Sequence, residues 1–155
     1  MIDPRLIVAV TEWLKARVPA VGDRVQPLAA AVPDAAPFVV YHGTAHDHRL
    51  TLKDLTGHVT ARLLLIVWHT DHLKACHLAA KIIGRKGDPG LHGLGGPLAH
   101  PEIDVGEADP IPEGQVAVQR CSLLPDSVQR DVPPIDGSEE RWFAVPLEFQ
   151  IVYQE

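Results

Sequence analysis

The most regular alternation of apolar and polar positions lies at the end of the chain, over residues 141–154. A side-chain period of two is typical of a strand with one buried face. Pro146 falls inside this pattern, and because it cannot donate a ladder hydrogen bond it predicts a sheet edge or a bulge. The apolar odd positions are Phe143, Val145, Leu147, Phe149, Ile151 and Tyr153.

A second strand is predicted over residues 57–69. Its odd positions are apolar throughout, whereas its even positions are polar up to Arg62 and apolar afterwards. A strand that becomes apolar on both faces is typical of the centre of a sheet. Shorter strands are expected within residues 21–27, over 38–41 and over 116–124, with 45–55 as a hairpin connection that has a polar tip.

Two segments carry helical spacing. Asp3 before Pro4 is a strong N-terminal signal, and it predicts a helix over residues 4–17 that Pro19 prevents from continuing. Asp71 caps a second helix that Gly84 ends. We expect the buried stripe of this second helix to be Leu73, Cys76, Ala80 and Ile83, and its solvated stripe to be Lys74, His77 and Lys81.

Residues 85–114 are rich in Gly and Pro and show little periodicity. The pattern predicts a long loop that projects as an arm or becomes ordered against a partner. Runs of strands with only two helices favour an α+β fold. We therefore expect one domain over residues 1–155, with a mainly antiparallel or mixed sheet, two helices packed on one of its faces, and the long Gly/Pro-rich loop inserted at about 85–114.

Charge and composition narrow the function classes. The formal net charge is −6, which argues against nucleic-acid wrapping, since that requires many Lys and Arg contacts to phosphate, and leaves a local basic patch open. We expect no sequence-specific nucleic-acid partner and no membrane partner. The sequence has no apolar run long enough for a membrane helix and no secretory signal at its start, so assembly in a cytoplasm is expected. Cys76 and Cys121 are expected to be two buried thiols rather than a disulfide.

Candidate chemistry is sparse. His72 and Cys76 are four residues apart on the second helix, an acceptable spacing for zinc, and His69 and His77 lie nearby. Packing of Cys76 is the competing explanation, and it is the one we adopt. The histidines of the segment His46-Asp47-His48 are expected to be solvated. No motif indicates a nucleophile, a phosphate-binding loop or a metal site, so we predict no catalytic residue and no cofactor.

The tryptophans stand out more than the histidines. Trp68 and Trp142 fall on the faces opposite the main apolar stripes. Two explanations are open: a second layer of packing, or a contact between subunits, where Trp is enriched. The candidate residues for a subunit or partner interface are Trp68, Trp142, Pro146, Glu148, Gln150, His46, His48 and His92.

In order along the chain, these segments resemble the tail-completion, or tail-terminator, proteins of long-tailed bacteriophages and of gene transfer agents. Residues 21–27 (VGDRVQP) are similar to the short segment after the family's first helix, and 37–41 (PFVVY) to its next strand. Residues 60–75 resemble its long strand and following helix. The closing pair of strands is matched by 119–126 and 140–153. Residues 85–114 lie outside the resemblance.

The resemblance implies a non-catalytic virion protein, assembled in the host cytoplasm, that forms a ring, typically of six subunits, on the end of the tail tube. Its partners would be further copies of itself, the major tail tube protein and the head–tail connector, and DNA would be free to pass through the ring. Two alternatives stay open. One is a head-closure or neck adaptor, and the other is a small zinc-dependent hydrolase built on His69, His72 and Cys76.

Overall fold

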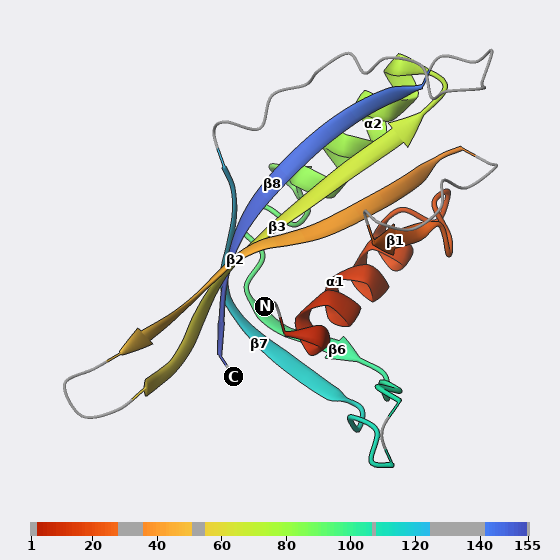
Figure 1. Ribbon diagram of the computed structural model, residues 1–155. Helices are drawn as coiled ribbons and strands as arrows, with labels where there is room; N and C mark the ends of the chain where they lie inside the picture. Colours follow the sequence, from red (N-terminus) through yellow and green to blue (C-terminus); the bar gives the residue numbers. More distant parts are fainter. Residues whose placement is uncertain (1–2, 28–35, 51–54, 107, 125–141, 155) are drawn as a thin grey trace.

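The protein folds into one curled sheet with two helices beside it (Figure 1). The structure, a computed structural model, describes residues 3–27, 36–50, 55–106, 108–124 and 142–154; the side chains of 44–50 and 55–58 lie outside the description. The six-stranded sheet has the order β1-β2-β3-β8-β7-β6. Only β1 and β2 are parallel, so the mixed sheet and the α+β class are as the sequence predicts. The elements are α1 (Pro4–Arg17), β1 (Val25–Pro27), β2 (Phe38–Leu50), β3 (Leu55–His69), α2 (His72–Ile83), β4 (Gly84–Arg85), β5 (Asp88–Pro89), β6 (Gly96–His100), β7 (Gly114–Leu123) and β8 (Phe143–Gln154).

Helix α1 begins and ends as the sequence predicts. The Asp3 carboxylate accepts a hydrogen bond from the Arg5 backbone nitrogen at 2.9 Å, which satisfies one of the free amides of the first turn. The backbone nitrogen of Val18 bonds the Leu14 carbonyl and closes the last turn. Helix α1 packs against β6 and β7, while α2 packs against β3 and β8.

The odd positions of β3 and β8 form the main core. They contact the buried sides of both helices, and we call this side of the sheet the inner face. Every odd position of β3 from Val59 to Val67 is buried, as is every odd position of β8 from Val145 to Tyr153. Full burial of a large apolar side chain contributes about 1.5–3 kcal/mol, so this face supplies much of the stability of the fold. The predicted apolar stripes of both strands are confirmed.

The predicted buried stripe of α2 is wrong. The buried residues are Ala75, Leu78, Ala79 and Ile82, and Leu73 is 78% exposed. The physical reason is that this helix carries small or apolar residues on most of its circumference, so periodicity does not decide which arc meets the sheet. The solvated positions Lys74, His77 and Lys81 are exposed as predicted, and Asp71 caps the helix through the Lys74 backbone nitrogen.

Two predicted connections belong to the sheet. Residues 45–50 continue β2 and pair with β3, from Ala45 opposite Arg62 to Leu50 opposite Leu55. Polar side chains at 46–48 had indicated a loop, but a strand that pairs through its backbone accommodates them. Within 85–114, β6 forms the end strand of the sheet against β7, and Leu91 and Leu98 are buried in the core. The first part of this segment, up to His100, is therefore built into the fold, and only the connection between β6 and β7 extends beyond the sheet (Figure 1).

A pair of glycines closes the turn after α2. Gly84 ends the helix with a φ of 91°, a left-handed conformation that side chains rarely adopt. A Cβ atom on Gly84 would overlap the backbone nitrogen of Gly90, and a Cβ on Gly90 would lie 2.5 Å from the Ile82 carbonyl oxygen. Both positions therefore require glycine, and their close approach holds the β4–β5 hairpin against the end of α2.

Candidate functional site

The side of the sheet away from the helices gathers most of the predicted interface residues. We call it the outer face, formed by the even positions of β3 and β8. Trp68, Pro146, Glu148 and Gln150 occupy such positions, with Ile66 opposite Pro146 and Arg62 opposite Gln150. Strand pairing therefore brings together residues that lie about eighty positions apart in the sequence. Among the described strands, pairing of β7 with β8 stops at Phe149, so Pro146 lies where β8 pairs with β3 alone.

One end of the outer face is a small apolar cluster. Phe38, Val40 and Trp142 are buried there, and Ile66 and Trp68 pack against them. The Phe38 ring is stacked on Trp68 with centroids 5.9 Å apart, and it meets Trp142 at 5.3 Å. Trp142 is 7% exposed, so its side chain is used almost entirely for packing within the chain. Trp68 is half-buried and keeps part of its surface available for a contact.

The other end of the outer face is polar. Arg62 is exposed, and its Nη1 lies 4.0 Å from Oε1 of the half-buried Glu148. An ion pair this open contributes at most about 1 kcal/mol to stability. Gln150 and Ser122 lie opposite each other on β8 and β7 and are also half-buried. Charged and amide groups in this arrangement offer hydrogen bonds to a partner without being needed for the core.

The three predicted interface histidines lie apart from the tryptophan cluster. The backbones of His46 and His48 belong to β2, opposite Ala61 and Val59, and their side chains lie outside the description. His92 is exposed, and its Nδ1 accepts a hydrogen bond from the Leu123 backbone nitrogen at 2.9 Å. That bond ties the segment before β6 to the end of β7, so His92 has a local structural role.

The residues of the zinc hypothesis do not form a metal site. His72 Nε2 lies 3.8 Å from Cys76 Sγ, but His69 Nδ1 accepts a hydrogen bond from the Asp71 backbone nitrogen at 3.0 Å. Burial lowers the pKa of His69, with Lys74 adding to the effect. The part of the chain that the structure describes holds no group of three or more side chains arranged to bind a metal ion.

Of the two thiols, Cys121 is buried as predicted, whereas Cys76 is only half-buried.

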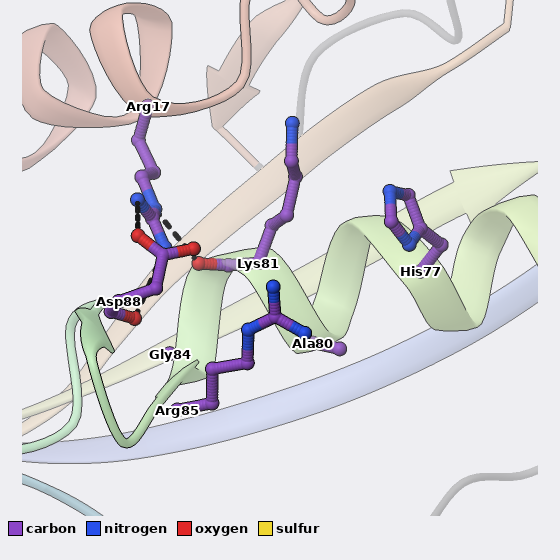
Figure 2. Close-up of a pocket in the computed structure, with 7 residues that line it drawn as sticks. All are labelled: Arg17, His77, Ala80, Lys81, Gly84, Arg85 and Asp88. Carbon is purple, nitrogen blue, oxygen red and sulfur yellow. Dashed lines mark hydrogen bonds and ion pairs between the residues drawn. The ribbon is translucent and has the colours of Figure 1, made fainter.

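A basic pocket lies where the ends of the two helices meet the β4–β5 hairpin, and sequence reasoning missed it. It holds about 150 Å³, and Figure 2 shows its seven lining residues. Arg17 reaches across from α1 and donates to the Asp88 carboxylate at 2.7 Å and to the Lys81 carbonyl at 3.0 Å. The pocket is lined by Arg17, His77, Ala80, Lys81, Gly84, Arg85 and Asp88.

Electrostatics in the basic pocket are dominated by cations. The hydrogen bond from Arg17 holds the pKa of Asp88 below its usual value, and Arg85 and Lys81 act in the same direction. The same bond raises the pKa of Arg17. Lys81, in the last turn of α2, and Arg85, on β4, are exposed, and neither forms an ion pair with a described side chain. The basic residues Lys81, Arg85 and Lys86 around the end of α2 were the sequence signal for this pocket, but Arg17 and Asp88 could be added only from the fold.

Comparison with known proteins gives one informative result. No family model and no curated protein matches the sequence. Among solved structures, the fold is similar to that of a chain from "Virion of native gene transfer agent (GTA) particle", with a TM-score of 0.53 and 15% sequence identity. The alignment covers 99% of this chain and 100% of that chain. At this identity the likeness establishes a shared fold. No described helix is both long and apolar enough to cross a membrane.

Proposed function

We propose that the protein is a structural component of a phage-like virion, which forms a ring on the end of the tail tube. The ring stops tube growth and joins the tail to the head connector. The observation that carries the proposal is the fold likeness to a chain of a gene transfer agent virion over nearly the full length of both chains. In this proposal the protein is not an enzyme, uses no cofactor, and is assembled in the host cytoplasm.

The sequence resemblance favours the same role. The segments that resemble tail-terminator proteins fall on β1, the start of β2, the second half of β3 with the start of α2, and the closing strands β7 and β8. These elements build five neighbouring strands of the sheet, in the order β1-β2-β3-β8-β7. A resemblance spread over adjacent strands is what a shared architecture would produce, since each strand must match its neighbours in length and pattern.

The outer face provides a surface for a neighbouring subunit or partner. Trp68, Glu148 and Gln150 combine an aromatic side chain with polar groups that the core does not use. Interfaces between proteins are enriched in such aromatic residues and surround them with a polar rim. In the proposed ring, Pro146 lies on the same surface, and His46, His48 and His92 belong to the margins of the subunit. The ring leaves a central passage for DNA without reading its sequence.

Co-assembly with tail tubes tests the proposal. Purified protein is mixed with major tail tube protein, and the products are sized by light scattering and imaged by negative stain. We expect rings of about six copies capping the tube ends and a limit on tube length. A matched pair of variants tests the outer face: Gln150→Arg should weaken capping, whereas Gln119→Arg, at an exposed position of β7, should not. Tubes that grow equally long with and without the protein would contradict the role.

A head-closure or neck adaptor is the second candidate. The similar structure is a chain of a whole virion, and the likeness fits either role. The two roles differ in which partner binds first. A pull-down with immobilised major tube protein, against one with the portal-side connector, separates them. Preferential retention by the connector would favour the adaptor.

A further inference from the structure

The connection between β6 and β7 is strongly acidic. We call residues 101–113 the acidic loop; it contains five Asp and Glu residues and no Lys or Arg. Two backbone hydrogen bonds between Ile103 and Ile111, of 2.8 and 2.9 Å, give it a fixed base. Figure 1 shows it extending beyond the ends of β6 and β7. Its described carboxylates, all exposed, are Glu102, Asp104, Asp109 and Glu113.

The basic pocket is the complementary surface. Arg17 is held by Asp88, but Lys81 and Arg85 face solvent with no ion-pair partner among the described side chains. These charges belong to a chain of net charge −6, so the pocket is a local exception to the charge of the whole. Figure 2 shows both side chains directed away from the Arg17–Asp88 pair, which leaves their charged groups available to a ligand.

We propose that the acidic loop of one copy docks into the basic pocket of the next copy, so that carboxylates pair with Lys81 and Arg85. The inference rests on the proposed ring and names its contact. None of the described residues of the acidic loop lines the pocket of its own chain, so we place the pairing between two copies. Because the two surfaces are different, the contact is head-to-tail, and copies joined in this way form a ring when the rotation closes.

The arrangement of charge favours a carboxylate over a nucleic-acid backbone. The pocket, of about 150 Å³, is large enough to admit a carboxylate group. Binding to a DNA backbone requires a row of cations along successive phosphates. The pocket supplies one compact group of basic residues on an acidic protein. A segment dense in Asp and Glu, present on every copy, fits it better.

Charge exchange tests the pairing. Lys81→Glu with Arg85→Glu reverses the pocket. Glu102→Lys, Asp104→Lys, Asp109→Lys and Glu113→Lys together reverse the loop, because four lysines then stand beside the one remaining acidic residue. Each set of substitutions should weaken association about a hundredfold, because like charges then face each other across the contact. A chain with both sets should associate again. An equal mixture of the two reversed chains should also associate, since alternating copies restore every contact.

Matched controls separate this effect from loss of charge in general. The control is Lys74→Glu. Lys74 lies on the same helix as Lys81, is exposed, and does not line the pocket. We expect Lys74→Glu to associate like the wild type and Lys81→Glu to associate less. Circular dichroism confirms that each variant is folded. Added salt should weaken the wild-type contact, because exposed charges are screened.

A zero-length carbodiimide crosslink between Lys81 and a loop carboxylate provides a readout that needs no variant. A mixture of ¹⁴N- and ¹⁵N-labelled wild-type chains, incubated with tail tubes, shows by mass spectrometry whether the linked peptides come from different copies. Crosslinks of mixed label support the pairing. Rings on tube ends that persist in both reversed variants would overturn the pairing and leave the proposed function standing.

The remaining outcomes are also decisive. Loop-to-pocket crosslinks between copies that never join a tube would support the contact and end the proposed role in tails. Wild-type chains with no association and no crosslinks, on or off tubes, would end both. If pocket reversal abolishes salt-dependent binding to duplex DNA while loop reversal leaves assembly unchanged, the pocket binds nucleic acid and the pairing is wrong.

Discussion

The inner and outer faces of the same two strands differ in how their side chains change along the sheet. On the inner face, the odd positions of β3 from Val59 to Val67 and of β8 from Val145 to Tyr153 are all apolar and buried. On the outer face, the apolar cluster around Phe38 gives way to Arg62, Glu148 and Gln150. The difference shows that the inner face, which the helices cover, provides most of the core packing. The outer face is divided: its apolar end packs within the chain, whereas its polar end is not needed for packing.

Truncation on the two faces should give the largest contrast. Phe149 is fully buried on the inner face, so Phe149→Ala should lower the free energy of unfolding by about 3–5 kcal/mol. Gln150, the next residue, lies on the outer face, and Gln150→Ala should change it by less than about 0.5 kcal/mol. Urea denaturation of both variants measures the difference. Similar losses would mean that the outer face is also part of the core.

The orientation of α2 on the inner face gives the next largest effect. Leu78→Ala should cost about 2–3 kcal/mol, because this side chain is nearly buried against the sheet. Leu73→Ala removes the same atoms from the first turn of the same helix, where the side chain is 78% exposed, and should be nearly neutral. Thermal or urea denaturation of the two variants shows which side of α2 faces the sheet. A larger loss of stability for Leu73→Ala than for Leu78→Ala would support the buried stripe that periodicity predicted.

The apolar end of the outer face should show a smaller, pairwise effect. Phe38 and Trp142 have ring centroids 5.3 Å apart, and such pairs contribute about 0.5–1.5 kcal/mol beyond the area they bury. A double-mutant cycle with Phe38→Leu and Trp142→Leu should give a coupling of that size. The control cycle joins Phe38→Leu with Phe149→Leu, which lies in the other cluster, and should give almost none. Equal couplings would mean that the two faces are not independent.

The smallest effect concerns the ion pair that joins α1 to the β4–β5 hairpin. Since Arg17 lowers the pKa of Asp88 in the folded chain, the pair stabilises the fold above the unfolded carboxyl pKa of about 3.9 and this stabilisation is lost as the pH falls through the lowered folded value. Asp88→Asn should therefore be less stable than the wild type at pH 7, with the gap closing in acid. In an Arg17→Gln background, the effect of Asp88→Asn should lose most of this pH dependence, and Arg85 and Lys81 account for the remainder. Denaturation at several pH values measures both.

Local signals were enough to predict the elements that depend on one stretch of chain. The limits of α1 follow from Asp3 and Pro4 at one end and Pro19 beyond the other. The inner stripes of β3 and β8 follow from a period of two that no single residue breaks. The grouping of Trp68 with Trp142 on one face also follows from that period. In these parts of the molecule, residues close in the sequence determine the structure, so the sequence pattern is sufficient to predict it.

Elements that depend on distant partners could not be predicted in the same way. Residues 46–49 are polar, and only the pairing of 45–50 with β3 makes this segment a strand. The strand β6 is short and contains Pro97, and it is held in the sheet by β7, about twenty residues further on. The basic pocket needs Arg17 beside Asp88, 71 positions away in the chain. No local pattern contains that information.

The glycine pair after α2 has a consequence for tracing ancestry. Core positions of this fold can exchange Leu, Ile and Val with little penalty, which over time erases the similarity that sequence searches detect. Gly84 and Gly90 cannot exchange in this way, because the backbone of each occupies the place where the other's side chain would be. Two glycines six residues apart, directly after an amphipathic helix, therefore form a durable signature. Distant relatives that keep this hairpin should be recognisable by it when the rest of their sequence has diverged.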